Sequence, residues 1–482
     1  MRAFCLLSLL ATGPSWAAPA AGAFRVPDTA IFSSPHAAQA MQPPEGARVG
    51  PRARPPSPPT AEGPPDVVVY GYLAYWAGSV ETVPYASLTH LAIFNVDLLS
   101  DGRVAFTDRW TGVAPRAVEL AAPYGVRVHL TLTCFDDAVM ESVLPSSTRR
   151  ATLVDQLGDL VEAAGAHGVS VDCEGMPSAL RDDFVVFVRA LRDRVPEVSV
   201  ALPAVDWTDA YDYDALADIA DQLFIMGYGY HWSGGDPGPN APLVGGAGWA
   251  TWSLAWSVED YRDNGVPDSK IVLGLPLYGQ RWPTSSTAVP GTSTGTASSV
   301  VMENAVVEAA ATGRLWEAHT STPYAFPSST RQLWYDDTES IAIKAGWAVE
   351  QGLGGFGFWA LDYEGGDPAF WAAIDAISHV DSPAPDTGGA TDGGAVDGGA
   401  ADGGAVDGGA AEGGGVDGAT ADAGADGGSA TDAADTGGSE GALGARFGKA
   451  VGCATAGPAA LLLLGLGALS RRRRGGPTHR PR

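Results

Sequence analysis

Between residues 67 and 379 the chain alternates short apolar runs with longer amphipathic stretches. The apolar runs are rich in Val, Ile, Leu and Phe, and runs of this kind between turn signals are typical of buried strands. Eight strands are predicted from them: Val67–Tyr72, Leu88–Val96, Val126–Cys134, Val169–Glu174, Val198–Leu202, Gln222–Tyr228, Ile271–Leu277 and Gly355–Trp359.

The stretches between these runs have the period of helices. The clearest predicted helices are Arg149–His167, in which Leu153 and Leu157 share one face, and Ala179–Val195. Eight strands alternating with helices predict an α/β fold, and we expect a parallel (β/α)8 TIM barrel rather than a doubly wound sheet. About sixty residues, Gln280 to Tyr335, separate the seventh and eighth strands and predict a small insertion beside the barrel.

The hydropathy pattern changes before residue 67. Residues 1–18 combine Arg2, a short apolar run and a small-residue site near Ala17, which predicts a secretory signal peptide. Residues 19–66 contain a Pro-rich stretch, with nine prolines between Pro43 and Pro65, and are predicted to be a disordered, semi-extended linker. The barrel is therefore expected over residues 67–380.

Residues 381–445 consist almost entirely of Gly, Ala, Asp, Ser and Thr, with an acid at every fifth position from Asp392 to Asp422. Calcium binding is one interpretation, but the segment lacks the apolar positions that would stack its turns. We expect a solvated, self-repelling stalk. It holds thirteen acids of a chain whose net charge is −27, so the barrel itself is far less acidic than the whole chain.

The last segment, residues 446–482, has three parts: a Gly-Cys pair at Cys453, an apolar run to Leu469 and four arginines from Arg471. This tail resembles the C-terminal sorting signals of myxobacterial surface proteins. The resemblance implies a sorting protease as a partner and anchoring near Cys453, whereas the alternative is a plain membrane anchor. Either way we expect an exported protein at the cell surface or outer membrane, touching the membrane through this tail only.

Two cysteines, Cys134 and Cys173, fall on consecutive predicted strands. An exported protein could oxidise them, but the sequence cannot fix the Cα separation that a bridge requires. We expect two buried free thiols, with a disulfide as the alternative. The spacing of cysteines and histidines predicts no metal site, and we expect no cofactor and no nucleic-acid partner.

The chemistry is predicted at the end of the fourth strand, where Asp172 and Glu174 are two residues apart. Side chains at this spacing on a strand share one face. Two carboxylates on one face raise one another's pKa, so that one can keep a proton near neutral pH and serve as a general acid. The plainer alternative is that both acids cap the following helix.

Aromatic residues follow other strands at the same end of the expected barrel. Tyr228 ends the sixth predicted strand, Trp232 follows it, and Trp359 ends the eighth. Flat aromatic rings around central acids suit a sugar, whose apolar face stacks on them, although aromatics at strand ends are also ordinary packing.

Several motifs together resemble glycoside hydrolase family 18, the chitinase-like family, over Val67 to about Ile377. Its fourth-strand fingerprint D-x-x-D-x-D-x-E is matched from His167 to Glu174, its sixth-strand M-x-Y-D by Met226 to Gly229, and its eighth-strand tryptophan by Trp359. The segments Thr89–Phe94 and Gln332–Asp337 also read like this family. The run Leu130–Phe135 is closer to its cortex-lytic, peptidoglycan-acting branch.

The resemblance implies that Glu174 protonates the glycosidic oxygen and that the acetamido oxygen of the sugar then attacks its own anomeric carbon. Asp172 would orient the acetamido group and Tyr228 would hold its oxygen in line. Substrate contacts are expected from Trp359, Met226, Tyr72, Phe94 and Trp232. The implied partner is an N-acetylated polysaccharide or oligosaccharide, bound by a monomer.

The fingerprint is incomplete, because His167, Ser170 and Gly229 stand where the family keeps acids. Ser170 carries no charge, so we expect Asp172 to meet less repulsion and to have a lower pKa unless another group compensates. The sequence therefore predicts a slower glycosidase with an altered pH profile. The alternatives are a lectin-like surface protein that binds sugar without turnover and an inert structural barrel.

Overall fold

A computed structural model describes residues 35–50 and 63–379. Eight parallel strands form its central sheet, all within two residues of the predicted starts. They are β1 (Val68–Ala74), β2 (His90–Leu98), β4 (Arg127–Cys134), β5 (Gly168–Cys173), β6 (Val198–Pro203), β7 (Gln222–Met226), β8 (Ile271–Pro276) and β14 (Gly355–Trp359). A short strand, β3 (Val104–Ala105), pairs antiparallel with the end of β2.

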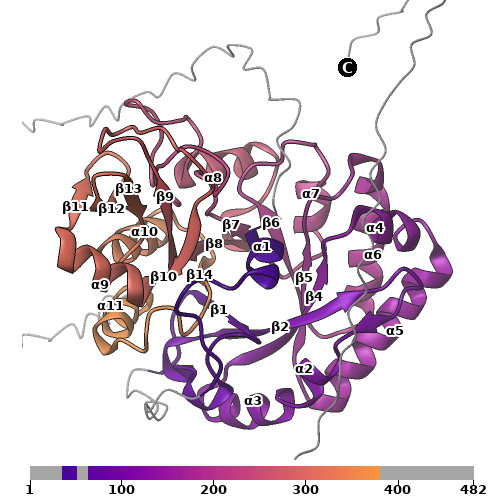
Figure 1. Cartoon of the computed structure of the whole chain (residues 1–482). Coiled ribbons are helices and arrows are strands. Elements are labelled where there is room, and N and C mark those ends of the chain that lie inside the picture. The colour runs from indigo at the N-terminus through magenta and orange to yellow at the C-terminus, as the bar shows by residue number, and fades with distance from the viewer. Residues whose placement is uncertain (1–34, 51–62, 380–482) are drawn as a thin grey trace, which may run out of the picture. The chain divides into compact units, whose positions relative to one another are not determined.

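The sheet order is β1-β14-β8-β7-β6-β5-β4-β2-β3, and β1 also pairs with β2, which closes the sheet into a barrel. Parallel strands need crossover connections, and helices supply most of them on the outside (Figure 1). They are α2 (Asp108–Thr111), α3 (Ala114–Ala121), α4 (Asp137–Val143), α5 (Ser147–Ala164), α6 (Arg181–Arg194), α7 (Tyr213–Ala217), α8 (Leu254–Asp263) and α10 (Thr338–Glu350), and α11 (Pro368–Ser378) follows the last barrel strand. The (β/α)8 barrel is confirmed.

The boundaries of α5 show how local sequence sets these helices. The Ser146 side chain accepts a hydrogen bond from the Arg149 N–H, which satisfies one of the free amides of the first turn. Gly165 ends the helix at a φ of 64°, a left-handed conformation that glycine adopts without steric cost. Between these ends, Leu153 and Leu157 are buried on one face, as their spacing predicts.

The insertion between the seventh and eighth barrel strands is a small α+β unit. Its five-stranded sheet has the order β10-β9-β13-β12-β11, and α9 packs against it over a core of its own. The elements are β9 (Tyr278–Pro283), β10 (Ser298–Val301), α9 (Met302–Thr312), β11 (Leu315–Glu317), β12 (Thr322–Ser328) and β13 (Arg331–Trp334). The predicted insertion is therefore present, and it follows β8 directly.

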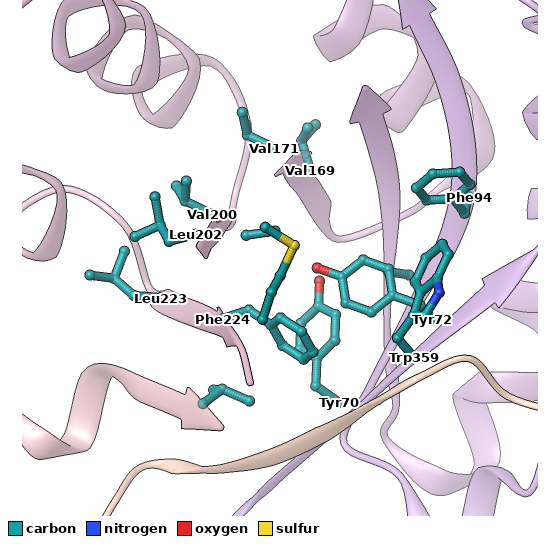
Figure 2. Packing of buried hydrophobic residues seen from close by; sticks show 14 of the residues in the cluster. Tyr70, Tyr72, Phe94, Val169, Val171, Val200, Leu202, Leu223, Phe224 and Trp359 are labelled. Carbon is teal, nitrogen blue, oxygen red and sulfur yellow. The ribbon is translucent and has the colours of Figure 1, made fainter. Parts of the chain in front are cut away.

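The barrel interior is aromatic. The rings of Tyr70, Tyr72, Phe224 and Trp359 gather inside, with the Tyr72 and Phe224 centroids 5.0 Å apart (Figure 2). Because side chains alternate along a strand, every second residue of a barrel strand points outward and packs under the helices. Val171 of β5 is such a residue and is fully buried.

One part of the predicted linker is folded. A short helix, α1 (Pro35–Met41), lies at the centre of the barrel in Figure 1, and its His36 and Gln39 side chains are buried. The spacer prediction is therefore wrong for residues 35–50. Proline content argued for an extended chain, but Pro35 suits the first turn of a helix and alanines follow it.

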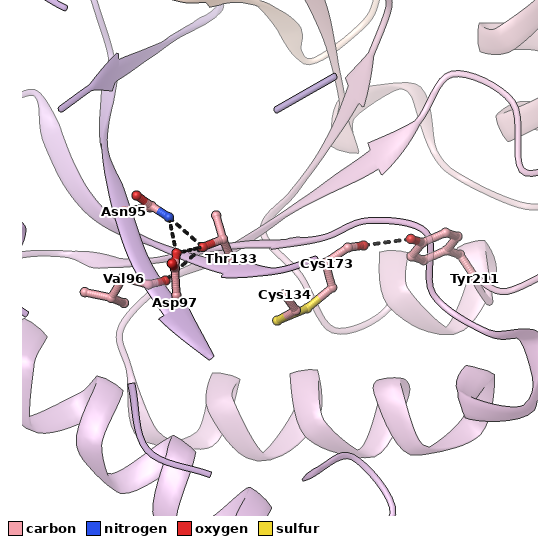
Figure 3. Close-up of a disulfide and its surroundings, with 7 residues drawn as sticks. All are labelled: Asn95, Val96, Asp97, Thr133, Cys134, Cys173 and Tyr211. Atoms are coloured by element: carbon pink, nitrogen blue, oxygen red, sulfur yellow. Dashed lines mark hydrogen bonds between the residues drawn. A yellow bond between two sulfur atoms is a disulfide. The ribbon is translucent and has the colours of Figure 1, made fainter. Parts of the chain in front are cut away.

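The two strand cysteines are joined by a disulfide, so the expected free thiols are a wrong prediction (Figure 3). Cys134 and Cys173 are direct register partners on β4 and β5, and their Cα atoms lie 4.3 Å apart. Sequence spacing could not show this, because register between two parallel strands depends on the closed sheet. The carbonyl of Cys173 also accepts a hydrogen bond from the Tyr211 hydroxyl.

The predicted signal peptide, the acidic stalk and the tail with Cys453 lie outside the described residues. Within residues 35–50 and 63–379, no helix has the length and apolar character needed to cross a membrane. The predictions for the chain ends therefore stay predictions.

The disulfide generates a stability prediction. It closes a loop over a sequence separation of 39 residues, and such a crosslink typically stabilises a fold by about 2–4 kcal/mol. We expect the double variant Cys134→Ala/Cys173→Ala to lose about that much free energy of unfolding, measured in urea without reductant. Adding reductant should bring the wild type close to the variant, and a wild type insensitive to reductant would contradict the prediction.

Candidate active site

The two predicted acids lie together at the carboxyl end of the barrel, which we call the barrel mouth. Asp172 is the fifth residue of β5 and is fully buried, and Glu174 follows the strand with 5% of its surface exposed. The backbone N–H of Glu174 donates to the Cys134 carbonyl, which holds this strand end against β4. The two carboxylates therefore sit on a rigid element, facing the interior.

Residues after β7 form a second wall of the site. Met226 ends the strand and Tyr228 follows it, and both side chains are almost fully buried. The Tyr228 ring lies 6.1 Å from that of Tyr278, on the first strand of the insertion. The insertion thus packs against the Tyr228 ring through Tyr278.

Trp359 forms the floor. It is fully buried at the end of β14, and Phe94 packs edge-on against it with ring centroids 4.9 Å apart. Tyr72 lies 5.8 Å from the same indole. Of the predicted substrate contacts, Trp359, Phe94, Tyr72 and Met226 surround the acids, whereas Trp232 is 42% exposed in the loop after β7.

A histidine that sequence reasoning missed lies at the centre of this site. His36 of α1 places Nδ1 2.7 Å from Asp172 Oδ2 and Nε2 2.6 Å from the Tyr228 hydroxyl. Its Nδ1 is also 3.3 Å from Glu174 Oε1, and its ring stacks on Trp359 at 3.8 Å.

Gln39, one helical turn after His36, was missed as well. Its side-chain oxygen accepts hydrogen bonds from Trp359 Nε1 at 2.9 Å and from the Tyr363 hydroxyl at 3.2 Å. The available signal was the i, i+3 spacing of two polar residues among alanines, behind a proline that can start a helix.

Burial dominates the electrostatics of the site. It raises the pKa of Asp172 well above its usual range. It lowers the pKa of His36 to about 4, although the charge of Glu174 acts in the opposite direction. His36 is therefore neutral at pH 7, with one ring nitrogen as a donor and the other as an acceptor. Burial alone raises the pKa of Asp172, although position 170 holds an uncharged serine, and the expected effect of the missing acid stays a prediction.

The three residues that differ from the family's motifs, Ser170, His167 and Gly229, each make a different hydrogen bond. Ser170 shares a 2.8 Å hydrogen bond with the Tyr72 hydroxyl directly beneath Asp172. His167 lies before β5 and its Nδ1 accepts from the Val128 N–H, so it is a structural residue. Gly229 has a φ of 81°, which favours glycine, and its N–H donates to the Asn240 side chain.

Two groups of described residues offer ligand atoms close enough for a metal ion: His36 with Asp172 and Glu174, and His90 with His129 and Glu197. In the second group, Glu197 already pairs with Arg127 and accepts from Gln222. That arrangement is a buried ion-pair cluster at the amino end of the strands. The first group is the site described above.

Chemically, the site can donate a proton and position an amide. A carboxyl group at the mouth, a second buried carboxyl group and a tyrosine hydroxyl converge above an indole floor, and general acid catalysis needs a group held at such a rigid position.

The family assignment follows from a match to the family model described as glycosyl hydrolases family 18, which covers residues 68–364 and thus more than half of the chain. The chain belongs to glycosyl hydrolase family 18. The fold and the position of the acids on β5 agree with the resemblance drawn from the fingerprint. The matched range contains the barrel and the insertion, and it leaves α1 outside.

Relatives of this family 18 chain include two proteins of Bacillus subtilis (strain 168). One is named as a sporulation-specific glycosylase, YdhD, and is 28% identical over 295 residues, covering 58% of this chain and 66% of the relative. The other is named cortical fragment-lytic enzyme and is 26% identical over 245 residues, 47% of this chain and 54% of the relative. The match therefore spans less than two thirds of each relative's length.

Solved structures share the fold. A chitinase from Trichuris suis superposes with a TM-score of 0.59 at 20% identity, covering 65% of this chain and 99% of that structure. A family 18 chitinase from Cycas revoluta, in complex with (GlcNAc)3, gives a TM-score of 0.58 at 18% identity, with 64% and 99% covered. At 18–20% sequence identity, these superpositions show only that the chain shares the barrel fold of the two chitinases.

The raised pKa of Asp172 predicts a pH-dependent stability effect. Ionising a carboxyl whose folded pKa is raised costs stability at every pH above its unfolded value of about 3.9. Asp172→Asn removes that cost, so we expect a higher melting temperature than the wild type at pH 7.

This advantage should shrink as the pH falls towards 4, because the unfolded carboxyl then protonates as well. Melting curves between pH 4 and pH 8 measure it, with the exposed Asp155→Asn as the matched control. A constant gap at all pH values, or a less stable variant at pH 7, would contradict this explanation.

Proposed function

We propose that this family 18 protein hydrolyses β-linked N-acetylglucosamine polymers, namely chitin, chitooligosaccharides or peptidoglycan. The observation that carries the proposal is the convergence of Glu174, Asp172 and Tyr228 above the Trp359 indole. A lone acid at a strand end is often structural, but a buried pair with a tyrosine and an aromatic floor has the components for binding and cleaving an acetamido sugar.

Glu174 is the general acid of this proposal. It is the more accessible of the two acids, at the solvent side of the pair, where a glycosidic oxygen could reach it. Protonation of that oxygen lets the leaving group depart, and the returned carboxylate then activates water for the second half of the reaction.

Asp172 is better suited to orient than to attack. It is fully buried, with one oxygen 2.7 Å from the His36 ring. The nucleophile would instead be the acetamido oxygen of the substrate, as in substrate-assisted glycosidases. Asp172 would accept from the acetamido N–H and stabilise the cation that forms, while the Tyr228 hydroxyl would hold the acetamido oxygen in line.

The relatives support the substrate class. One bears the name cortical fragment-lytic enzyme, and a chitinase with this fold has been solved with (GlcNAc)3. Both names fit an N-acetylated glycan and favour neither chitin nor peptidoglycan. Such a substrate needs no metal and no cofactor in this scheme.

A lectin-like protein on the same barrel is the second candidate. The observation behind it is the absence of acids at three positions where the family keeps them, namely His167, Ser170 and Gly229. Ser170 keeps a hydrogen bond to Tyr72, but it cannot exchange a proton with Asp172 as a carboxyl would. We therefore expect a slow enzyme, and a total loss of turnover would leave the binding function.

We also propose that the protein is exported and held at the cell surface, as a monomer, by residues 446–482. The predicted signal peptide supports export, and so does the Cys134–Cys173 disulfide, because such bonds persist in oxidising compartments. A sorting protease acting near Cys453 would attach the chain by its tail.

The catalytic proposal predicts the effect of Glu174→Gln. Losing the general acid should lower the initial rate on N-acetylated chitooligosaccharides by about 100- to 10,000-fold, measured as reducing ends released. Exposed Glu119→Gln is the matched control and should keep the wild-type rate. Fully deacetylated oligosaccharides should not be cleaved by either protein.

Equal rates for the wild type and Glu174→Gln would overturn the hydrolase proposal. Binding of (GlcNAc)3 without any turnover, measured by calorimetry, would instead support the lectin-like function. Purified peptidoglycan assayed beside the oligosaccharides would separate the two substrate classes.

The anchoring proposal predicts where a truncated chain is found. Expressed in a bacterium that recognises the tail, the full chain should fractionate with the cell envelope, and a chain ending at residue 445 should appear in the medium. Immunoblots of the two fractions measure this. Retention of the truncated chain on the cells would contradict anchoring through the tail.

A further inference from the structure

The N-terminal segment, residues 35–50, occupies the place where a sugar would bind. Its helix α1 places His36 between the two acids, the tyrosine and the indole floor, and the His36 side chain has no exposed surface. Asp172 Oδ2, the Tyr228 hydroxyl and the Trp359 indole N–H are therefore already engaged by another part of the same chain.

The contacts of His36 reproduce those of an acetamido group. A neutral imidazole with its proton on Nδ1 donates to Asp172 Oδ2 at 2.7 Å and accepts from the Tyr228 hydroxyl at 2.6 Å. An acetamido group presents the same pair, an N–H donor and an oxygen acceptor. The imidazole also lies flat on Trp359, with ring planes 28° apart, where a sugar face would stack.

Gln39 also contacts the Trp359 floor of the site. Its side-chain oxygen takes the hydrogen bond of the Trp359 indole N–H, so neither the face nor the edge of this indole is open to a ligand. His36 and Gln39 lie on one face of α1, whereas Met41 at its end is 83% exposed. The helix thus presents two specific polar side chains to the barrel, while Ala38 and Met41 are exposed to solvent.

The residues after α1 fasten the segment to the rim. The Glu45 N–H donates to the Ser299 carbonyl, and the Glu45 carbonyl accepts from the Val301 N–H, so this residue adds to the edge of β10. Ion pairs join Glu45 to Arg281 and Arg48 to Glu303. Because main-chain bonds are specific in register, they set where α1 enters the barrel.

A second pair of main-chain bonds fastens the end of the segment. The Gly50 N–H donates to the Gly78 carbonyl, and the Gly78 N–H donates to the Arg48 carbonyl. Residues 45–50 therefore bind both the insertion and the loop after β1. A chain held at these points remains close to the site even when α1 leaves it.

We propose that residues 35–50 are an intramolecular inhibitor, in which His36 substitutes for the acetamido group of the substrate, so that the folded chain is a latent glycosidase. This inference rests on the proposed function, because it names the sugar site as the place that α1 blocks. A glycan and α1 compete for Asp172, Tyr228 and Trp359, and the enzyme turns over only while α1 is displaced.

The expected consequence is a reduced apparent affinity. When only a fraction of molecules is open, the apparent dissociation constant rises by the inverse of that fraction. The tether makes the competition intramolecular, so dilution does not relieve it. Removing α1 contacts should therefore tighten sugar binding and raise turnover together.

The test uses full-length variants, His36→Ala, Gln39→Ala and the double variant. Losing two buried hydrogen bonds and a ring stack should shift the closed state by about tenfold or more. We expect kcat/KM on N-acetylated chitooligosaccharides to rise by about that factor for His36→Ala and further for the double variant. Met41→Ala, on the exposed side of the same helix, should leave it unchanged.

Binding is measured separately in the Glu174→Gln background, where hydrolysis cannot consume the probe. Calorimetry with (GlcNAc)3 should give a dissociation constant about tenfold lower when His36→Ala is added. Thermal unfolding of each variant verifies that the barrel is folded, since α1 contributes no strand to it.

The outcomes separate this inference from the proposed function. Equal kcat/KM and equal (GlcNAc)3 binding with and without His36 would overturn the inhibitor while leaving the glycosidase intact. Tighter binding on loss of His36 without any hydrolysis would support the inhibitor and overturn the hydrolase. Failure of (GlcNAc)3 to bind any folded variant would overturn both.

Hydrogen–deuterium exchange of the unmutated chain gives an independent measurement. Saturating (GlcNAc)3 should speed exchange of the backbone amides in residues 35–41 and slow it around Tyr228. Unchanged protection of α1 with the sugar bound would show that helix and sugar bind together, and would overturn the inhibitor proposal.

Discussion

Burying a carboxylate in the centre of an aromatic barrel is costly unless a polar partner accompanies it. Asp172 is fully buried, and one of its oxygens meets the ring of His36. This single contact organises the barrel mouth, because the same imidazole also binds Tyr228 and lies on Trp359. The helix, the tyrosine and the indole floor are thereby held in one arrangement.

The buried carboxyl groups at the two ends of the barrel differ in their partners and in the direction of their pKa shifts. At the amino end, burial raises the pKa of Glu197, but hydrogen bonds from His129 and His90 outweigh it and hold the pKa well below its usual range. That carboxylate is ionised and fully partnered, as a structural group should be. At the carboxyl end, burial raises the pKa of Asp172 without such compensation. Strongly perturbed groups of this second kind mark functional sites more often than stable cores.

The fold carries the site on its least flexible parts. Asp172 belongs to a strand paired on both sides, and the disulfide ties that strand to β4 one residue further on. Trp359 ends β14, which pairs with β1 and β8. In contrast, α1 contributes no strand to the barrel and is held by side chains and a few main-chain bonds at the rim. An element of that kind can leave while the catalytic geometry persists.

Period and spacing in the sequence determined the eight strands, the insertion and the shared face of Asp172 and Glu174, because these depend on neighbours along the chain. The fingerprint similarly pointed to Tyr228 and Trp359. Only the tertiary structure decided the register that brings Cys134 to Cys173, and the burial that raises the pKa of Asp172. It alone decided that His36, 136 residues from Asp172, lies against it. Local sequence holds no record of such contacts, since they arise when a closed sheet brings distant segments to one point in space.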